Sequence, residues 1–180
     1  MSANIYNLFK FLEKKKGTKT PLRVKFIYAP DELTDEELNV EGSLYLQNTQ
    51  ITSLPNNLKV EGNLNLSHTK IDSLPDNLQV EDNLDLANTP ITSLPDNLKI
   101  GGGINLANTP ITSLPDNLQV GGNFMSIGSK ISSIPNNLKV GRILYLSNTP
   151  LAEKYSEKEI RNMIEKKGGY VGYVKGASYD

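Results

Sequence analysis

The sequence predicts an α/β repeat solenoid, with a curved parallel sheet along one side, a short irregular convex side and helical caps at the N- and C-terminal ends. Three observations predict this fold. The chain repeats itself at a strict period of 20 residues from about 44 to 151. Each unit opens with two apolar residues one position apart, as in Leu64-Asn-Leu66. An amphipathic segment precedes the array and another follows it.

Residues 1–21 are expected to form an N-terminal capping helix. Ile5, Leu8, Phe9 and Leu12 recur at helical spacing, and the helix should end near Gly17. Such a helix laid across the first open end of a repeat stack would hide the apolar side chains exposed there. The apolar run is short and its lysines follow it, so we do not expect a signal peptide and place the protein in the cytoplasm of a bacterium or of an infected cell.

Residues 22–151 are expected to form the solenoid, beginning with a degenerate first repeat over 22–43. The stretch from 22 to 28 alternates as a strand does, and Val24 and Phe26 fall 20 residues before Leu44 and Leu46. The full repeats start at Leu44, Leu64, Leu84, Ile104 and Phe124, and a partial one starts at Leu144.

Within each repeat, the two leading apolar residues predict a short strand whose alternate side chains enter the core. A column of small hydroxyls follows, whose members could satisfy backbone groups and stack into an internal polar ladder. A Leu-Pro or Ile-Pro pair then turns the coil onto its outer side, and Gly62, Gly102 and Gly122 return the chain with their freedom in φ. The hydroxyl column consists of Thr49, Thr69, Thr89, Thr109, Ser129 and Thr149.

Residues 152–180 are expected to form a C-terminal cap made of a helix and a strand. Ser156 and Glu159 have the spacing of a capping box, and Ile160, Met163 and Ile164 give the helix a buried stripe. The stretch from 170 to 174 then alternates like a terminal strand, and its free edge could support a homo-oligomer.

The repeats resemble the leucine-rich repeat family, whose units carry a Leu-x-Leu-x-x-Asn core followed by an apolar position and a leucine. The likeness covers roughly 24–151, and the Ile-Thr-x-Leu-Pro stretch is similar to short repeats of bacterial effectors and of phage and bacterial arrays. The chain departs from the family by carrying Thr at the usual Asn position. The resemblance implies a protein-binding module, such as an adaptor or an inhibitor of a host or cellular protein.

Charge and composition narrow the classes of partner and of chemistry. The chain carries 19 basic and 20 acidic side chains, a net charge of −1 that favours neither nucleic acid nor an anionic membrane as a whole. There is no cysteine, which excludes disulfides and thiolate chemistry. A basic patch is predicted at Lys14, Lys15, Lys16 and Lys19. An acidic run over 31–41 follows it, so these groups either face each other or leave the lysines to contact nucleic acid or a membrane.

A partner is expected to meet the concave face of the sheet. If the leading leucines point inward, the residues beside them point outward in columns that stack from repeat to repeat. The columns begin at Lys25 and Ile27 and are polar in the middle, which could also serve solubility alone. The predicted partner-binding residues are Tyr45, Gln47, Asn65, Ser67, His68, Asp85, Asn105, Met125, Ile127 and Tyr145.

One repeat breaks the pattern. In the stretch 124–129, Ser126 occupies a core position, while Met125 and Ile127 occupy outward positions that are polar or small elsewhere. Either the strand slips so that both apolar residues enter the core, or they form an apolar patch with Ile143 and Tyr145.

Nothing in the sequence favours an enzyme. His68 is the single histidine and has no suitable partner in its columns, the aspartates do not reproduce a calcium loop, and Gly101–Gly103 is predicted to be a turn. We therefore expect a non-enzymatic protein-binding module without metal, cofactor or small-molecule substrate. The alternatives are a carbohydrate or cell-surface recognition module, and a hydrolase or transferase that would need convergent titratable groups.

Overall fold

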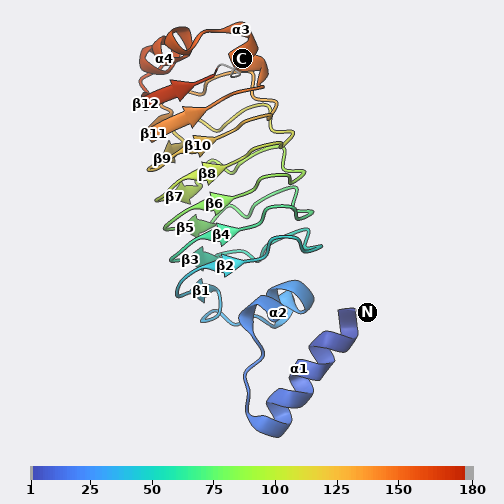
Figure 1. Ribbon diagram of the computed structural model, residues 1–180. Helices are drawn as coiled ribbons and strands as arrows, with labels where there is room; N and C mark the ends of the chain where they lie inside the picture. The colour runs from blue at the N-terminus through green and yellow to red at the C-terminus, as the bar shows by residue number, and fades with distance from the viewer. Residues whose placement is uncertain (1, 177–180) are drawn as a thin grey trace.

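The computed structural model describes residues 2–176 and shows a parallel β-solenoid with short helices at both ends (Figure 1). One turn of the solenoid is 20 residues long, because Leu44 pairs with Leu64 and Leu64 with Leu84. The repeat array and its register are confirmed. Residue 1 and residues 177–180, which belong to the two predicted caps, lie outside the described part of the chain.

Each turn contributes two short strands, where the sequence predicted one. The predicted strands form a Leu ladder, and the residues just before them form a Val ladder in which Val60 pairs with Val40 and Val80. The Val ladder consists of β1 (Asn39–Val40), β3 (Lys59–Val60), β5 (Gln79–Val80), β7 (Lys99–Ile100) and β9 (Gln119–Val120). The Leu ladder consists of β2 (Leu44–Tyr45), β4 (Leu64–Asn65), β6 (Leu84–Asp85), β8 (Ile104–Asn105) and β10 (Phe124–Met125).

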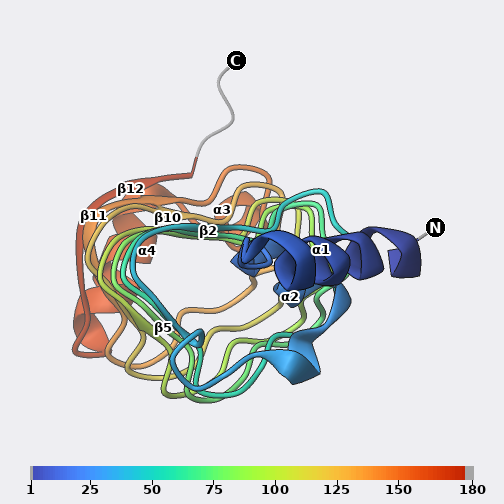
Figure 2. The same ribbon diagram turned by 90° about the horizontal axis from the view of Figure 1, so that it is seen from below.

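The two ladders merge at the C-terminal end of the stack. Strand β11 (Lys139–Tyr145) runs through both ladders, and β12 (Tyr170–Lys175) pairs with it in parallel, with Tyr145 opposite Lys175. Viewed along the stack, the ladders occupy adjacent sides of a closed cross-section, and irregular turns occupy the others (Figure 2). The predicted irregular side is therefore present.

The core is a continuous apolar column inside this cross-section. Both leading leucines of a repeat are fully buried, as Leu64 and Leu66 show, and the valine of the Val ladder is buried with them. The isoleucine and the leucine before proline, such as Ile71 and Leu74, fill the opposite side of the column. Because each turn covers only its neighbours, the ends of the column need separate covers.

The hydroxyl column is buried except for the half-buried Thr49, but its threonine hydroxyls do not link one repeat to the next. Thr69 Oγ1 donates to the carbonyl of Leu66 at 2.7 Å, and Thr89 Oγ1 donates to that of Leu86 at the same distance. Each bond therefore closes the turn of its own repeat. Ser129 is the exception, since its buried Oγ has no hydrogen-bond partner within the described residues.

The N-terminal end is covered by α2 (Leu22–Tyr28), so the prediction of a strand at 22–28 is wrong. Helical spacing places Leu22, Phe26 and Ala29 on one side, and Phe26 is 3% exposed against the core. A helix satisfies its own backbone hydrogen bonds, whereas a strand here would have left an open edge. The short helix η1 (Pro30–Glu32) follows.

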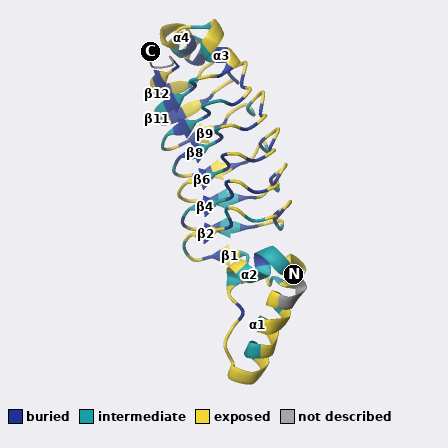
Figure 3. Cartoon of the chain, turned by 45° about the vertical axis from the view of Figure 1, so that its right-hand side comes forward, coloured by how far each residue is buried: buried dark blue, intermediate teal, exposed yellow. Residues whose placement is uncertain are grey.

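Helix α1 (Ser2–Lys16) ends before Gly17, as predicted, but it does not lie across the solenoid. It projects away from the stack and touches α2 (Figure 1). Figure 3 shows that much of its surface is exposed. The prediction that this helix covers the apolar end of the stack is wrong, because the shorter α2 already occupies that position.

The predicted C-terminal helix and strand are both present. After α3 (Pro150–Lys154), helix α4 (Glu157–Lys166) begins with a capping box in which Ser156 Oγ accepts from the N–H of Glu159. Ile160 and Ile164 are buried. The guanidinium of Arg161 donates to the carbonyl of Gly172 at 2.8 Å, so α4 occupies a backbone acceptor of the terminal strand.

The left-handed position that follows each strand of the Leu ladder is held by asparagine, by His68 or by Gly128, and not by the glycines that the sequence predicted for flexibility. Asn48 and His68 have φ of 58° and 56°. Gly62 and Gly102 do not have positive φ; a Cβ on either would lie 2.6 Å from Ser43 Oγ and 2.7 Å from the Asp82 carbonyl carbon, respectively. These glycines are needed for close approach between turns.

Candidate functional site

The outward face of the Leu ladder carries the predicted columns in consecutive rows. Tyr45 opposes Asn65, Asp85 opposes Asn105, and Met125 opposes Tyr145. Lys25 and Ile27 are not part of this face, because they belong to α2. The row is instead extended at the other end by Lys175, whose Nζ lies 5.8 Å from the centre of the Tyr145 ring.

Several polar residues of this face are engaged in their own turns. Asn65 Oδ1 accepts from both the N–H and the hydroxyl of Ser67, at 3.0 and 2.8 Å, and Ser67 is buried. Asp85 and Asn105 accept in the same way from the backbone two residues later. One oxygen of each side chain is thus used in a hydrogen bond to the backbone that follows the strand. Ser67 is a structural residue and not the exposed contact that the sequence predicted.

Two further predicted partner-binding residues, Gln47 and His68, differ in their exposure to solvent. Gln47 is half-buried, and its buried Oε1 has no hydrogen-bond partner within the described residues. His68 is exposed, and its Nε2 lies 3.3 Å from the side-chain nitrogen of Asn88. Asn108 continues this line of amides toward Asn88 Oδ1 at 3.1 Å. His68 is therefore one member of a surface ladder, and the described residues contain no cluster of carboxylates and histidines suited to a metal.

The irregular repeat keeps its register, so the strand does not slip. Met125 pairs with Asn105 and Tyr145, and Ser126 is fully buried with its Oγ donating to the Tyr145 carbonyl at 2.9 Å. Met125 and Ile127 consequently remain half-exposed on the outward face. With Ile143 and Tyr145, which are also half-exposed, they constitute an apolar set on the last two repeats. We call these four residues the apolar patch.

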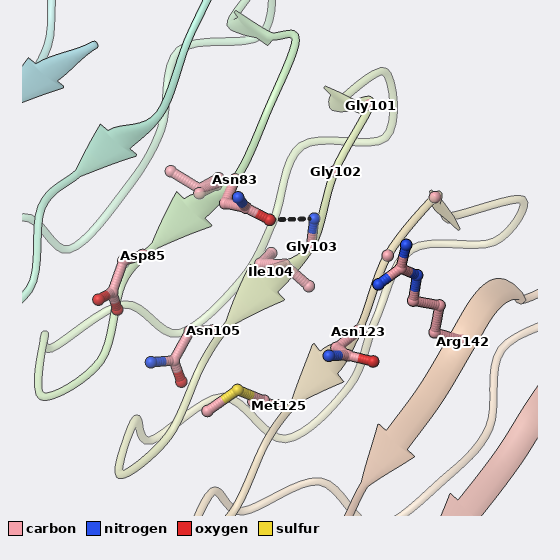
Figure 4. A pocket seen from close by; sticks show the side chains of 13 residues that line it. Asn83, Asp85, Gly101, Gly102, Gly103, Ile104, Asn105, Asn123, Met125 and Arg142 are labelled. Carbon is pink, nitrogen blue, oxygen red and sulfur yellow. Dashed lines mark hydrogen bonds between the residues drawn. The ribbon is translucent and has the colours of Figure 1, made fainter.

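A hollow of about 510 Å³ lies beside the apolar patch, and the sequence analysis did not predict it (Figure 4). It opens where the chain turns from the Val ladder into the Leu ladder. The first repeats carry side chains at this corner, as in Glu81-Asp82-Asn83, but the next two carry Gly101–Gly103 and Gly121–Gly122. The walls of the hollow include Asn83, Asp85, Asn105, Asn123, Met125 and Arg142.

The glycines that form the floor of the hollow lie in close contact with the backbone of the preceding turn. A Cβ on Gly121 would lie 2.1 Å from the carbonyl oxygen of Gly101, and one on Gly141 would lie 2.2 Å from that of Gly121. No side chain fits at these positions without moving the backbone. The prediction that Gly101–Gly103 forms a turn is confirmed, and the same residues also form the floor of the hollow.

An asparagine ladder is interrupted inside the hollow. Asn63 Oδ1 accepts from the N–H of Asn83 at 3.2 Å, and Asn83 Oδ1 accepts from the N–H of Gly103 at 2.7 Å, as drawn in Figure 4. Gly103 has no side chain, so the N–H of Asn123 lacks the corresponding bond. The ladder resumes where Asn123 Oδ1 accepts from the N–H of Ile143 at 3.2 Å.

Two side chains give the hollow opposite charges. Among the described residues that line it, Arg142 is the only cation and Asp85 the only carboxylate. Figure 4 places the Arg142 guanidinium on the side of Asn123, with Asp85 and Asn105 along the strand ends. The hollow can therefore donate hydrogen bonds to an anionic or carbonyl group at one side and accept them at the other.

The four lysines of the predicted basic patch lie in two settings. Lys14, Lys15 and Lys16 lie at the end of α1, whereas Lys19 lines a groove with several glutamates, including Glu36 and Glu41. Two ion pairs join the basic N-terminal segment to the acidic run over 31–41, and they use lysines outside the predicted patch. Lys10 Nζ lies 2.9 Å from Glu32, and Lys25 Nζ lies 2.6 Å from Glu37.

Comparisons with known proteins do not identify a family for the chain. No protein-family model, curated protein or solved structure matches the chain. Among the described helices, none has the length and apolar character needed to cross a membrane.

Proposed function

We propose that the chain is a non-enzymatic leucine-rich repeat module that binds another protein or a peptide through the outward face of the Leu ladder. The observation that carries the proposal is the apolar patch beside the hollow. Every other repeat places a polar or small side chain at the positions of Met125 and Ile127, except for the tyrosines at the two ends of the row. Apolar side chains that stay half-exposed without entering the core are typical of interface centres.

The partner suited to this surface is an extended segment that combines an apolar and an acidic side chain. The apolar side chain would lie on Met125 and Ile127. The carboxylate would accept from Arg142, and a backbone carbonyl could take the N–H of Asn123 that the ladder leaves without its side-chain acceptor. The glycine floor admits backbone closely because it has no side chains to displace.

The leucine-rich repeat assignment rests on the repeat itself. Its support is the Leu-x-Leu pair in a parallel strand, the 20-residue period and the left-handed asparagine that closes most strands, as at Asn88 and Asn108. We infer that the solenoid acts as other binding solenoids do, by presenting one extended face.

The proposal is tested by selecting a displayed random-peptide library on the wild-type chain. Individual peptides are then measured by fluorescence polarisation on the wild type, on Met125→Glu/Ile127→Glu, and on Thr112→Glu/Ser113→Glu. The last variant adds the same charge at exposed positions on the irregular side. We expect selected peptides to bind the wild type and this control equally, and to bind the patch variant at least about tenfold more weakly.

Two results would argue against the proposal. Equal affinity for the patch variant would move the binding surface elsewhere, provided that circular dichroism shows the variant to be folded. Failure to select any peptide, combined with a specific ligand on a glycan array, would favour the carbohydrate-recognition alternative.

A further inference from the structure

We propose that helix α1 is a membrane-docking element that lays its exposed side on an anionic lipid surface. The proposal concerns a different surface from the outward face of the Leu ladder and does not depend on the function proposed for it. It starts from the finding that α1 is amphipathic, as the sequence predicted, but does not use its apolar side to cover the solenoid.

One side of α1 is committed to the rest of the protein. Tyr6 donates to Glu32, Lys10 forms an ion pair with the same carboxylate at 2.9 Å, and Thr20 donates to Glu13 at 3.0 Å. The hydrogen bonds from Tyr6 and Lys10 hold the pKa of Glu32 below its ordinary value. These contacts fix which side of α1 faces η1 and the segment before α2.

The opposite side carries an apolar stripe. Leu8 and Phe11 lie at three-residue spacing and are 55% and 53% exposed. Ile5, three residues before Leu8, is 45% exposed and forms the edge of the stripe, because it also lines a hollow with Val24 and Ile27 of α2. Among the side chains that the structure describes, the other large exposed apolar groups are three tyrosines, which carry a hydroxyl. Among the described residues, the stripe therefore carries the most exposed large side chains that lack any polar group.

The stripe ends in a group of lysines. Lys14, Lys15 and Lys16 form the last turn of α1, and no described carboxylate lies within ion-pair distance of them. Lys15 Nζ lies 4.9 Å from the centre of the Phe11 ring, so its ammonium lies over the last apolar side chain of the stripe. A lysine arranged in this way can leave its stem among lipid chains and keep its ammonium at the phosphate level.

Charge and area favour a lipid surface over a second copy of the chain. Three side chains on one helix cover far less than the roughly 800 Å² per partner that a stable protein interface buries. Two copies would also bring like charges close together. A membrane requires no matched partner surface, because each apolar side chain partitions separately and each lysine adds its own attraction to anionic headgroups.

The helix would lie in the plane of the surface and not cross it. Its 15 residues correspond to about 22 Å of helix, shorter than the hydrocarbon core of a bilayer. Docking through the stripe leaves Tyr6 and Glu13 in their contacts with the rest of the chain, so binding requires no unfolding of the N-terminal region.

The absence of tryptophan from the chain makes a direct test possible. Phe11→Trp introduces a single reporter in the stripe, and Tyr170→Trp introduces one at an exposed position on β12, at the opposite end of the stack. Both full-length variants are titrated with phosphatidylcholine vesicles that contain or lack phosphatidylserine. We expect the tryptophan emission of the Phe11→Trp variant to shift to the blue only with phosphatidylserine vesicles, and that of the control variant not to shift.

Vesicle flotation separates the two contributions. Leu8→Glu/Phe11→Glu and Lys15→Glu/Lys16→Glu should each reduce the bound fraction at least about tenfold, whereas Lys99→Glu/Lys139→Glu, two exposed lysines of the Val ladder, should bind as the wild type does. Binding should also weaken strongly in about 0.5 M salt.

Three results would overturn the proposal. The first is no shift and no flotation with phosphatidylserine vesicles. The second is unchanged binding of the stripe variant. The third is a wild-type dimer in light scattering that Leu8→Glu/Phe11→Glu converts to a monomer, which would show that a second copy covers the stripe.

Discussion

The hydroxyl column offers a test of what holds the turns of the solenoid together, because one of its buried hydroxyls is hydrogen-bonded and another is not. Thr89 and Ser129 occupy equivalent positions and are both buried. The hydroxyl of Thr89 donates to the Leu86 carbonyl at 2.7 Å, whereas the hydroxyl of Ser129 has no partner within the described residues. We predict that Thr89→Val destabilises the protein and that Ser129→Ala does not.

The magnitudes follow from the burial of each group. Thr89→Val removes a buried hydrogen bond and leaves the Leu86 carbonyl without that donor, which costs roughly 1–3 kcal/mol. The added methyl group returns up to about 0.8 kcal/mol, so the net loss should be about 0.2–2 kcal/mol. Ser129→Ala removes a buried hydroxyl that has lost its water and gained no bond, so the free energy of unfolding should be unchanged or should rise by up to about 1 kcal/mol.

Urea denaturation followed by circular dichroism and by tyrosine fluorescence measures both changes. Coincident curves for the two signals would show that the array unfolds in one step, which repeat proteins do not always do. Thr109→Val, where the hydroxyl donates to Leu106 at 2.8 Å, serves as a second bonded position. The reasoning would be refuted if Ser129→Ala cost as much as Thr89→Val, since the hydroxyls would then act by filling space.

Two further predictions concern the ends of the stack. Arg161→Gln should free the Gly172 carbonyl on the edge strand β12, so the average mass in light scattering should rise as protein concentration increases. The control variant Lys158→Gln, on the exposed side of α4, should not show this rise. Equal masses for the two variants would show that Arg161 does not protect the edge. Burial alone would raise the pKa of Glu37, but the Lys25 ion pair and the bond from Thr34 N–H outweigh it and hold that pKa below 4.5. This contribution to stability is present above pH 4.5 and is lost as pH falls through the lowered pKa, so the melting-temperature advantage of the wild type over Glu37→Gln should shrink only in that acid range. A difference that stays constant with pH would contradict this.

The periodic part of the chain was predictable because the constant spacing of the repeats defines how each strand aligns with the next. The 20-residue period fixed which residues stack, and the alternation of Leu64 and Leu66 fixed which side chains enter the core. The capping box at Ser156 was predictable for a similar reason, since its two bonds join residues three positions apart. Local patterns of this kind carry their structural consequence within a few residues.

The ends of the solenoid could not be predicted in the same way. The stretch 22–28 fits the spacing of a strand and also that of a helix, and only the space left at the first open turn selects the helix that buries Phe26. Helix α1 was recognisable as amphipathic, but whether its apolar side faced the core depended on that choice. The Val ladder was not predicted, because its Leu-x-Val alternation is equally consistent with a return to the core that forms no second strand.

The sequence by itself therefore determined the solenoid, its period, the core residues of the regular repeats and the irregularity of the repeat that contains Met125. Only the tertiary structure decided that the strand of residues 124–129 keeps its register, that the glycines at 101–103 and 121–122 open a hollow walled by Arg142, and that α1 leaves its apolar stripe in solvent. The physical reason is that a repeat encodes contacts with its identical neighbours. A hollow depends on which side chains are missing from adjacent turns. An uncovered helix depends on which segment occupies the open end of the stack.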